Sequence, residues 1–142
     1  MSYSQQTLFS NLGYPVGVAV DSGGDVFADD DGLYADGTTD TVEELSAGGG
    51  SPSTLDSTQD VLWFMATDAA GDVFVADRTG GSVLEFKSGF VAGDSPITIP
   101  VNGAEQIHGV AVDASGDLFV ADAGGGLGDG SLYELKPQTN GS

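Results

Sequence analysis

The chain has 142 residues, with 22 acidic side chains against three basic ones, a formal net charge of −19, 23 glycines and no cysteine. Such a charge repels nucleic-acid phosphates and anionic lipid, and the lack of cysteine excludes disulfides, thiol catalysis and thiolate metal sites. No apolar run approaches the roughly 18 residues of a membrane helix, and the opening MSYSQQTLF has no signal-peptide pattern. The glycine content and scattered apolar runs predict one all-β domain of short strands and tight turns.

One phrase occurs three times along the chain. The copies are GVAVDSGGDVFADD (17–30), FMATDAAGDVFVAD (64–77) and GVAVDASGDLFVAD (109–122). Their central aspartates, Asp21, Asp68 and Asp113, are 47 and 45 residues apart. Repeats of about 40 to 50 residues that contain several strands are typical of β-propeller blades.

Each repeat is predicted to contain four strands. A short Thr-rich strand comes first, at 5–9, 51–55 and 95–100. An inner strand follows at 17–20, 64–67 and 109–112, a third strand at 25–29, 72–76 and 117–121, and a fourth at 41–45, 82–86 and 131–135. The last two strands alternate apolar and polar residues, as strands with packed faces do. The domain 1–142 therefore divides into three predicted blades, at about 4–47, 48–93 and 94–137.

The Asp-x-x-Gly-Asp segment between the second and third strands predicts a structural turn. Glycine adopts the positive φ of a tight hairpin, and the first aspartate accepts hydrogen bonds from amides of the turn. A calcium loop is the alternative, but each copy has too few oxygen ligands. The predicted turn residues are Asp21, Gly24, Asp68, Gly71, Asp113 and Gly116.

The phrases PVGVAVDSGGDVF and IHGVAVDASGDLFVAD closely resemble the NHL repeat, P-x-G-V-A-V-D-x-x-G-x-V-Y-V-A-D. The lead-in QQTLFSNLGYP resembles the linker between blades in extracellular sensor propellers of bacterial serine/threonine kinases. The resemblance implies a six-bladed propeller and an extracellular or periplasmic bacterial location. The senescence-marker/gluconolactonase family and several lyases have similar blades. The fourth strands depart from the family pattern: they open with Thr41-Val42, Ser82-Val83 and Ser131-Leu132 instead of N-R-V.

Three blades do not close a ring, because propellers have 4 to 8 blades. Two chains would supply six blades, and twofold symmetry is the commonest symmetry of oligomers. The chain begins with an outermost strand, 5–9. It ends with the strand at 131–135, which is third from the centre of its blade and lacks an outer partner. We therefore expect a homodimer in which residues 5–9 complete the last blade of the other chain. The alternative origins are a fragment of a longer propeller and an engineered half.

Ligand binding is expected at the rim of the central channel. Val16, Trp63 and His108 hold equivalent positions just before the inner strands, yet each is a different residue type. Tyr34 and Asn102 are further candidates for the rim. His108, with Glu105 and their twofold mates, can form an acid/base or metal site; alternatively, His108 packs beside Trp63. The gluconolactonase-type channel glutamate is missing, since no predicted inner strand contains Glu.

The acidic loops are candidates for a hard cation such as Ca²⁺. The carboxylates considered are Asp31, Asp36 and Asp40 in the first blade and Asp129 in the third. The alternative is a solvated acidic loop. Asp30, Asp77 and Asp122 recur at the end of the third strand, which indicates a structural capping role.

No nucleophile elbow or phosphate-binding loop occurs in the sequence. The favoured function is a non-catalytic NHL-type propeller module that assembles into a six-bladed ring. Its acidic face would bind a protein, peptide, glycan or cation, with no nucleic acid and no membrane insertion. The alternative is a metal-assisted hydrolase or lyase that uses His108 from both chains.

Overall fold

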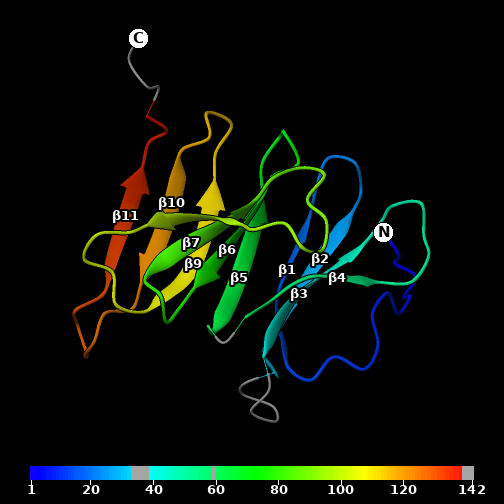
Figure 1. The fold of residues 1–142 in the computed structure, drawn as a ribbon, viewed down its shortest axis with the longest axis horizontal. Coiled ribbons are helices and arrows are strands. Elements are labelled where there is room, and N and C mark those ends of the chain that lie inside the picture. The colour runs from blue at the N-terminus through cyan, green and yellow to red at the C-terminus, as the bar shows by residue number, and fades with distance from the viewer. Residues whose placement is uncertain (33–38, 59, 139–142) are drawn as a thin grey trace.

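The computed structural model describes residues 1–32, 39–58 and 60–138. Over these residues the chain forms three antiparallel sheets that lie side by side (Figure 1), so the predicted all-β class is confirmed. The three sheets are called blades 1, 2 and 3. No helix in the described ranges is long and apolar enough to cross a membrane.

Within each blade the strands follow one another in chain order. Blade 1 contains β1 (Pro15–Val20), β2 (Val26–Asp30), β3 (Asp40–Leu45) and β4 (Ser53–Thr58). Blade 2 contains β5 (Leu62–Thr67), β6 (Val73–Asp77), β7 (Ser82–Phe86) and β8 (Ile97–Pro100). Blade 3 contains β9 (Ile107–Val112), β10 (Leu118–Asp122) and β11 (Ser131–Leu135).

Two differences from the sequence-based expectation concern outer strands. Residues 5–9 form no strand in the single chain and pair with none of the three sheets. Blade 3 has three strands instead of four, since the described chain ends after its third strand. In blades 1 and 2 the outer strand, β4 or β8, is the segment just before the next blade's inner strand.

The turns that join β1 to β2, β5 to β6 and β9 to β10 contain the same pair of hydrogen bonds to an aspartate. In blade 1, Oδ1 of Asp21 accepts hydrogen bonds from the N–H groups of Gly23 and Asp25, both at 2.9 Å. Asp68 and Asp113 accept the equivalent pairs in blades 2 and 3. The glycines Gly24, Gly71 and Gly116 have φ of 90°, 85° and 82°, a conformation that costs glycine little.

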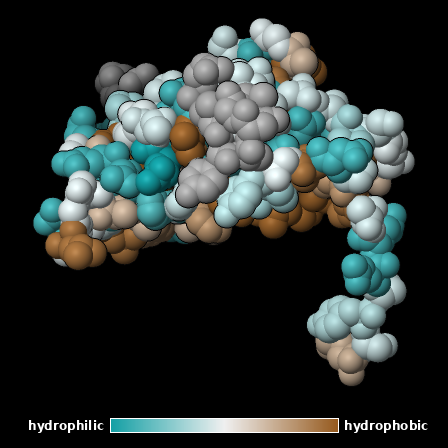
Figure 2. Space-filling view, turned by 90° about the horizontal axis from the view of Figure 1, so that it is seen from below, coloured by the Kyte–Doolittle hydropathy of each residue, from teal (hydrophilic) through white to brown (hydrophobic). Residues whose placement is uncertain are grey.

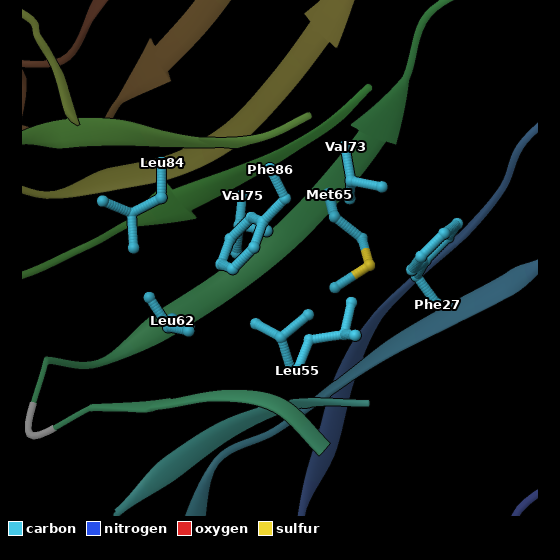
Figure 3. Close-up of a cluster of buried hydrophobic side chains, with 9 residues drawn as sticks. Phe27, Leu55, Leu62, Met65, Val73, Val75, Leu84 and Phe86 are labelled. Carbon is cyan, nitrogen blue, oxygen red and sulfur yellow. The ribbon is translucent and has the colours of Figure 1, made fainter. Parts of the chain in front are cut away.

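A hydrophobic core lies between blades 1 and 2 (Figure 3). Blade 1 contributes Phe27, Val42 and Leu55, and blade 2 contributes Leu62, Met65, Val73, Val75, Leu84 and Phe86. A second core joins blades 2 and 3 through Phe74, Ala76, Val83, Val101, Ile107, Leu118 and Val120. Each blade thus buries a face of alternate residues against its neighbour, which is how successive sheets of a propeller are held together.

The two end blades each have apolar side chains that are exposed in the described part of the chain. Leu132 in blade 3 corresponds to Val83 in blade 2, yet it is 73% exposed while Val83 is 0% exposed. At the other end, Val18 and Val20 of β1 are 67% and 54% exposed. Apolar residues gather along one edge of the body, and a narrow arm of chain projects away from it (Figure 2).

Candidate binding site at the channel mouth

The three inner strands bring the candidate rim residues together. β5 contacts both β1 and β9 (Figure 1), so the inner strands lie next to one another. Near its start, each inner strand has a register shift against its neighbour, around Val16, Trp63 and His108. Such bulges change the direction of a side chain and occur often beside functional sites.

Trp63, Arg78 and His108 form one stacked cluster. The ring centroids of Trp63 and His108 are 4.5 Å apart, and Cζ of Arg78 lies 4.9 Å from the centroid of the Trp63 ring. Arg78 Nε donates to His108 Nε2 at 3.4 Å, and its Nη2 donates to Gln106 Oε1 at 2.9 Å. The guanidinium can only donate, so Nε2 of His108 acts as the acceptor.

Arg78 reaches this place because it directly follows β6. Its N–H donates to the carbonyl of Val61 at 2.9 Å, and the same backbone bond is made by Asp31 in blade 1 and Ala123 in blade 3. The same backbone position is therefore occupied by Asp31 in blade 1, Arg78 in blade 2 and Ala123 in blade 3. The sequence analysis overlooked Arg78 and Gln106, although Arg78 is the only arginine of a strongly acidic chain and follows a predicted strand.

Phe64 extends the cluster with an exposed aromatic surface. Its ring lies 6.3 Å from that of Trp63, edge-on at 89°, and the residue is 48% exposed. Its φ of 21° is strained for a residue with a side chain, and Gly17 and Gly109 occupy the equivalent positions in the other blades. Strain of this kind gathers at binding and catalytic sites.

Arg78 differs from the two lysines of the chain in its charged partners. Lys87 lies within 2.8 Å of carboxylate oxygens of both Asp72 and Glu85, and Lys136 pairs in the same way with Asp117 and Glu134. In the described ranges, no carboxylate lies within ion-pair distance of Arg78. Of the three Lys and Arg side chains, Arg78 is therefore the one without an ion pair among the described residues.

Within the described ranges, the other predicted rim residues take no part in the side-chain contacts of this cluster. Val16 is partly buried on β1, and Asn102 is exposed in the turn after β8. Glu105 is exposed, and its carboxylate lies against Gly125 of the loop after β10. Tyr34 is outside the described residues.

Two of the predicted metal candidates lie in blade 1 and one lies in blade 3. Asp31 and Asp40 are buried in blade 1, where Oδ2 of Asp40 accepts from the N–H of Leu62 at 2.7 Å. Asp129 is exposed in a blade 3 loop, and Asp36 is outside the described residues. Across the part of the chain that is described, no three His, Asp or Glu side chains are placed to hold one metal ion.

The aspartates at the ends of β2, β6 and β10 hold nearby loops in place through hydrogen bonds. Asp30 accepts from the N–H groups of Gly13 and Tyr14 at 2.8 and 2.6 Å. Asp122 accepts from Glu105 and Gln106 in the same manner, and Asp77 accepts from Gly80 and Ser82 in its own loop. These bonds hold Gln106, and with it the acceptor for Arg78, in position.

Asp29 is a buried acid in β2. It stands where blades 2 and 3 have Ala76 and Ala121, it is fully buried, and its Oδ1 accepts from the N–H of Gly17. Burial raises its pKa to about 6, and the charge of Asp40 adds to the shift. β2 therefore contains a buried titratable group where the other two blades have alanine.

Comparison with known proteins identifies the fold and no more. No protein-family model matches the chain, and no curated protein matches it. Among solved structures it is similar to the PQQ-bound aldose sugar dehydrogenase from Streptomyces coelicolor, at 18% identity and a TM-score of 0.68, over 87% of this chain and 44% of that one. It is also similar to a putative gluconolactonase, at 17% identity and a TM-score of 0.67, over 91% and 47% of the two chains.

A third similar structure is virginiamycin B lyase from Staphylococcus aureus, at 12% identity and a TM-score of 0.66. The match covers 95% of this chain and 45% of the lyase. The chain thus spans less than half the length of each of these proteins. The similar structures are propeller-type proteins, and the three blades described above have the fold of part of a β-propeller.

Proposed function

We propose that the chain is a non-catalytic, NHL-type half-propeller that pairs with a second copy to form a six-bladed, acidic binding ring. The observation that carries this proposal is the uncovered apolar face at each end of the blade array. Leu132 and Val18 are mostly exposed, although the equivalent residues of blade 2, Val83 and Met65, are buried by a neighbouring blade. A second copy would cover both faces, with blade 3 of each chain packed on blade 1 of the other.

The order of the strands supports the exchange of residues 5–9. β4 and β8 each lie just before the inner strand of the next blade and pair with the edge of the preceding blade. Residues 5–9 lie before β1 in the same way. The blade that would precede blade 1 in a closed ring is blade 3 of another chain, so residues 5–9 would pair with β11 of that chain. The N-terminus and β11 are at opposite ends of the array (Figure 1), which prevents the arm from pairing with its own blade 3.

Binding is a better account of the channel mouth than catalysis. The lone pair on Nε2 of His108 is taken by Arg78, and the adjacent guanidinium would repel a divalent cation. Glu105, the proposed companion of His108, lies against Gly125 instead. Neither of these contacts, within the described residues, favours the hydrolase or lyase alternative. The formal charge of −19 supports a role for the acidic face in recognising a cationic partner.

The test is the mass of the assembly in solution. Light scattering across a concentration series is expected to give twice the chain mass of 14.3 kDa. Deleting residues 1–10 is expected to weaken the assembly at least about 100-fold, because a strand's worth of hydrogen bonds, each worth about 1 kcal/mol, is lost. Deleting residues 1–4 serves as the control, because it leaves 5–9 in place. A single-chain mass for the intact protein at micromolar concentration would refute the ring.

A further inference from the structure

We propose that the cluster of Arg78, Trp63 and Phe64 binds a ligand that carries one carboxylate on a flat apolar body, such as an aromatic carboxylate. This inference rests on the binding role proposed above. It concerns an anion held at Arg78, which is a ligand distinct from the cationic partner proposed for the acidic face. It does not depend on closure of the ring, because all three residues belong to one chain.

The distribution of charge is the first argument. The chain has 22 acidic side chains and three basic ones, so a basic group without an acidic neighbour is unusual here. Lys87 and Lys136 each hold two carboxylates, whereas Arg78 has none at ion-pair distance within the described ranges. Its charge is available to an anion from outside the chain. The surrounding negative charge would oppose a multiply charged anion, such as a phosphate dianion, more than a monocarboxylate.

The unused hydrogen-bond donors are the second argument. A guanidinium has five N–H groups, and Arg78 uses one on Nε and one on Nη2. The other three have no acceptor among the residues described. The buried indole N–H of Trp63 also has no acceptor there. All of these groups are hydrogen-bond donors, whereas a carboxylate only accepts. The planar guanidinium of Arg78 can hold a carboxylate through two parallel N–H···O bonds, called the fork below.

The position of Arg78 is fixed before any ligand arrives. Its side chain is stacked on Trp63 and held by His108 and Gln106, and its backbone N–H is bonded to Val61. A preorganised guanidinium loses little conformational entropy when it binds. His108 is therefore a positioning residue in this proposal.

Phe64 accounts for the apolar part of the ligand. About half of the residue is exposed, and its ring stands perpendicular to that of Trp63. The two rings form an aromatic corner around the indole that Arg78 contacts. The strained φ of Phe64, at a position where the other blades have glycine, indicates that this side chain is retained at a cost. A flat ring packs against such a corner through stacked and edge-on contacts.

The experiment uses Trp63, the only tryptophan of the chain, as its own reporter. Phenylacetate is titrated into the protein while the tryptophan fluorescence is recorded, and phenylacetamide, its neutral analogue, is titrated in parallel. We expect saturable binding of phenylacetate and at least about tenfold weaker binding of phenylacetamide, because the amide cannot form the charged fork.

Variants assign the effect to the site. Arg78→Gln is expected to weaken phenylacetate binding at least about tenfold, and Arg78→Lys, which keeps the charge but loses the fork, is expected to fall in between. Lys87→Gln removes the same charge elsewhere and is expected to bind as the parent does. Phe64→Ala is expected to weaken binding severalfold. Circular dichroism confirms that each variant is folded.

Equal binding of the acid and the amide to the unmodified protein would overturn the proposal, and that comparison needs no variant. Equal binding by a folded Arg78→Gln protein would overturn it as well, as would the absence of saturable binding. The assembly mass separates this outcome from the fate of the ring. A single-chain mass with selective phenylacetate binding refutes only the ring, whereas a two-chain mass without such binding refutes only the carboxylate site.

Discussion

Blades 2 and 3 have nearly the same sequence and opposite environments. Val83 and Leu132 occupy the same register position opposite an alanine of the neighbouring strand, Ala76 in blade 2 and Ala121 in blade 3. Ala76 and Val83 are buried, whereas Ala121 and Leu132 are exposed. The pattern of a blade therefore specifies which face is apolar, and the next blade determines whether that face is buried. In blade 3 of the single chain this neighbour is missing.

The largest expected effect comes from placing a charge on each face. Val83→Asp would bury an unpaired carboxylate between blades 2 and 3 and is expected to cost about 4 kcal/mol or more, which is enough to unfold a marginally stable chain. Leu132→Asp is expected to leave the folded chain intact and to abolish the two-chain assembly. Circular dichroism and light scattering on the two variants measure these outcomes. A Leu132→Asp protein that keeps a two-chain mass would show that this face is not the interface.

A smaller effect on the free energy of unfolding is expected at Asp29, where blades 2 and 3 have alanine. The folded pKa of Asp29 is about 6, above its ordinary value of 3.8, so folding favours the protonated carboxyl. The wild-type chain is therefore expected to lose stability as the pH rises from about 4 to about 6, by about 3 kcal/mol at 1.36 kcal/mol per pKa unit.

Asp29→Asn keeps an acceptor for Gly17 but cannot ionise, so it is expected to remove this loss. Urea unfolding at pH 4 and pH 7.5 measures the difference between variant and wild type, which is expected to grow in favour of the variant at the higher pH. Asp129→Asn, which removes one charge from an exposed loop, is the control for net charge. A difference that does not change with pH would contradict the prediction.

The smallest effect is expected where blades 2 and 3 are alike. Lys87 joins Asp72 and Glu85 just as Lys136 joins Asp117 and Glu134. Because Lys87 is largely exposed, Lys87→Gln is expected to cost at most about 1 kcal/mol. Urea unfolding at low and high salt measures this cost, which is expected to shrink as salt screens the pair. A cost of several kcal/mol, unchanged by salt, would show that this bridge stabilises blade 2 by another mechanism.

The strands and turns could be predicted from the sequence because their causes are local. Asp21 and Gly24 act within five residues of each other, and the period-two alternation that identifies a strand lies in the strand itself. The inner strand predicted at 64–67 lies within β5, and the fourth strand predicted at 82–86 coincides with β7.

The binding cluster could not be predicted in the same way. Trp63, Arg78 and His108 come from three separate segments. They meet because β5 and β9 lie side by side and the end of β6 positions Arg78. The sequence identified Trp63 and His108 by comparing repeats, but Arg78 has Asp31 and Ala123 as its equivalents and stood outside the compared positions. Likewise, nothing in the local pattern of Asp29 indicates that a carboxylate there is buried between two blades.

The unpaired N-terminal arm has a kinetic consequence. If a blade is completed only by a segment of another molecule, the last step of folding is bimolecular, and its rate rises with protein concentration. Each copy also donates an arm at one end and accepts one at the other, so the contact is head-to-tail. The angle between blades then decides whether the assembly stops at two copies or continues as an open filament.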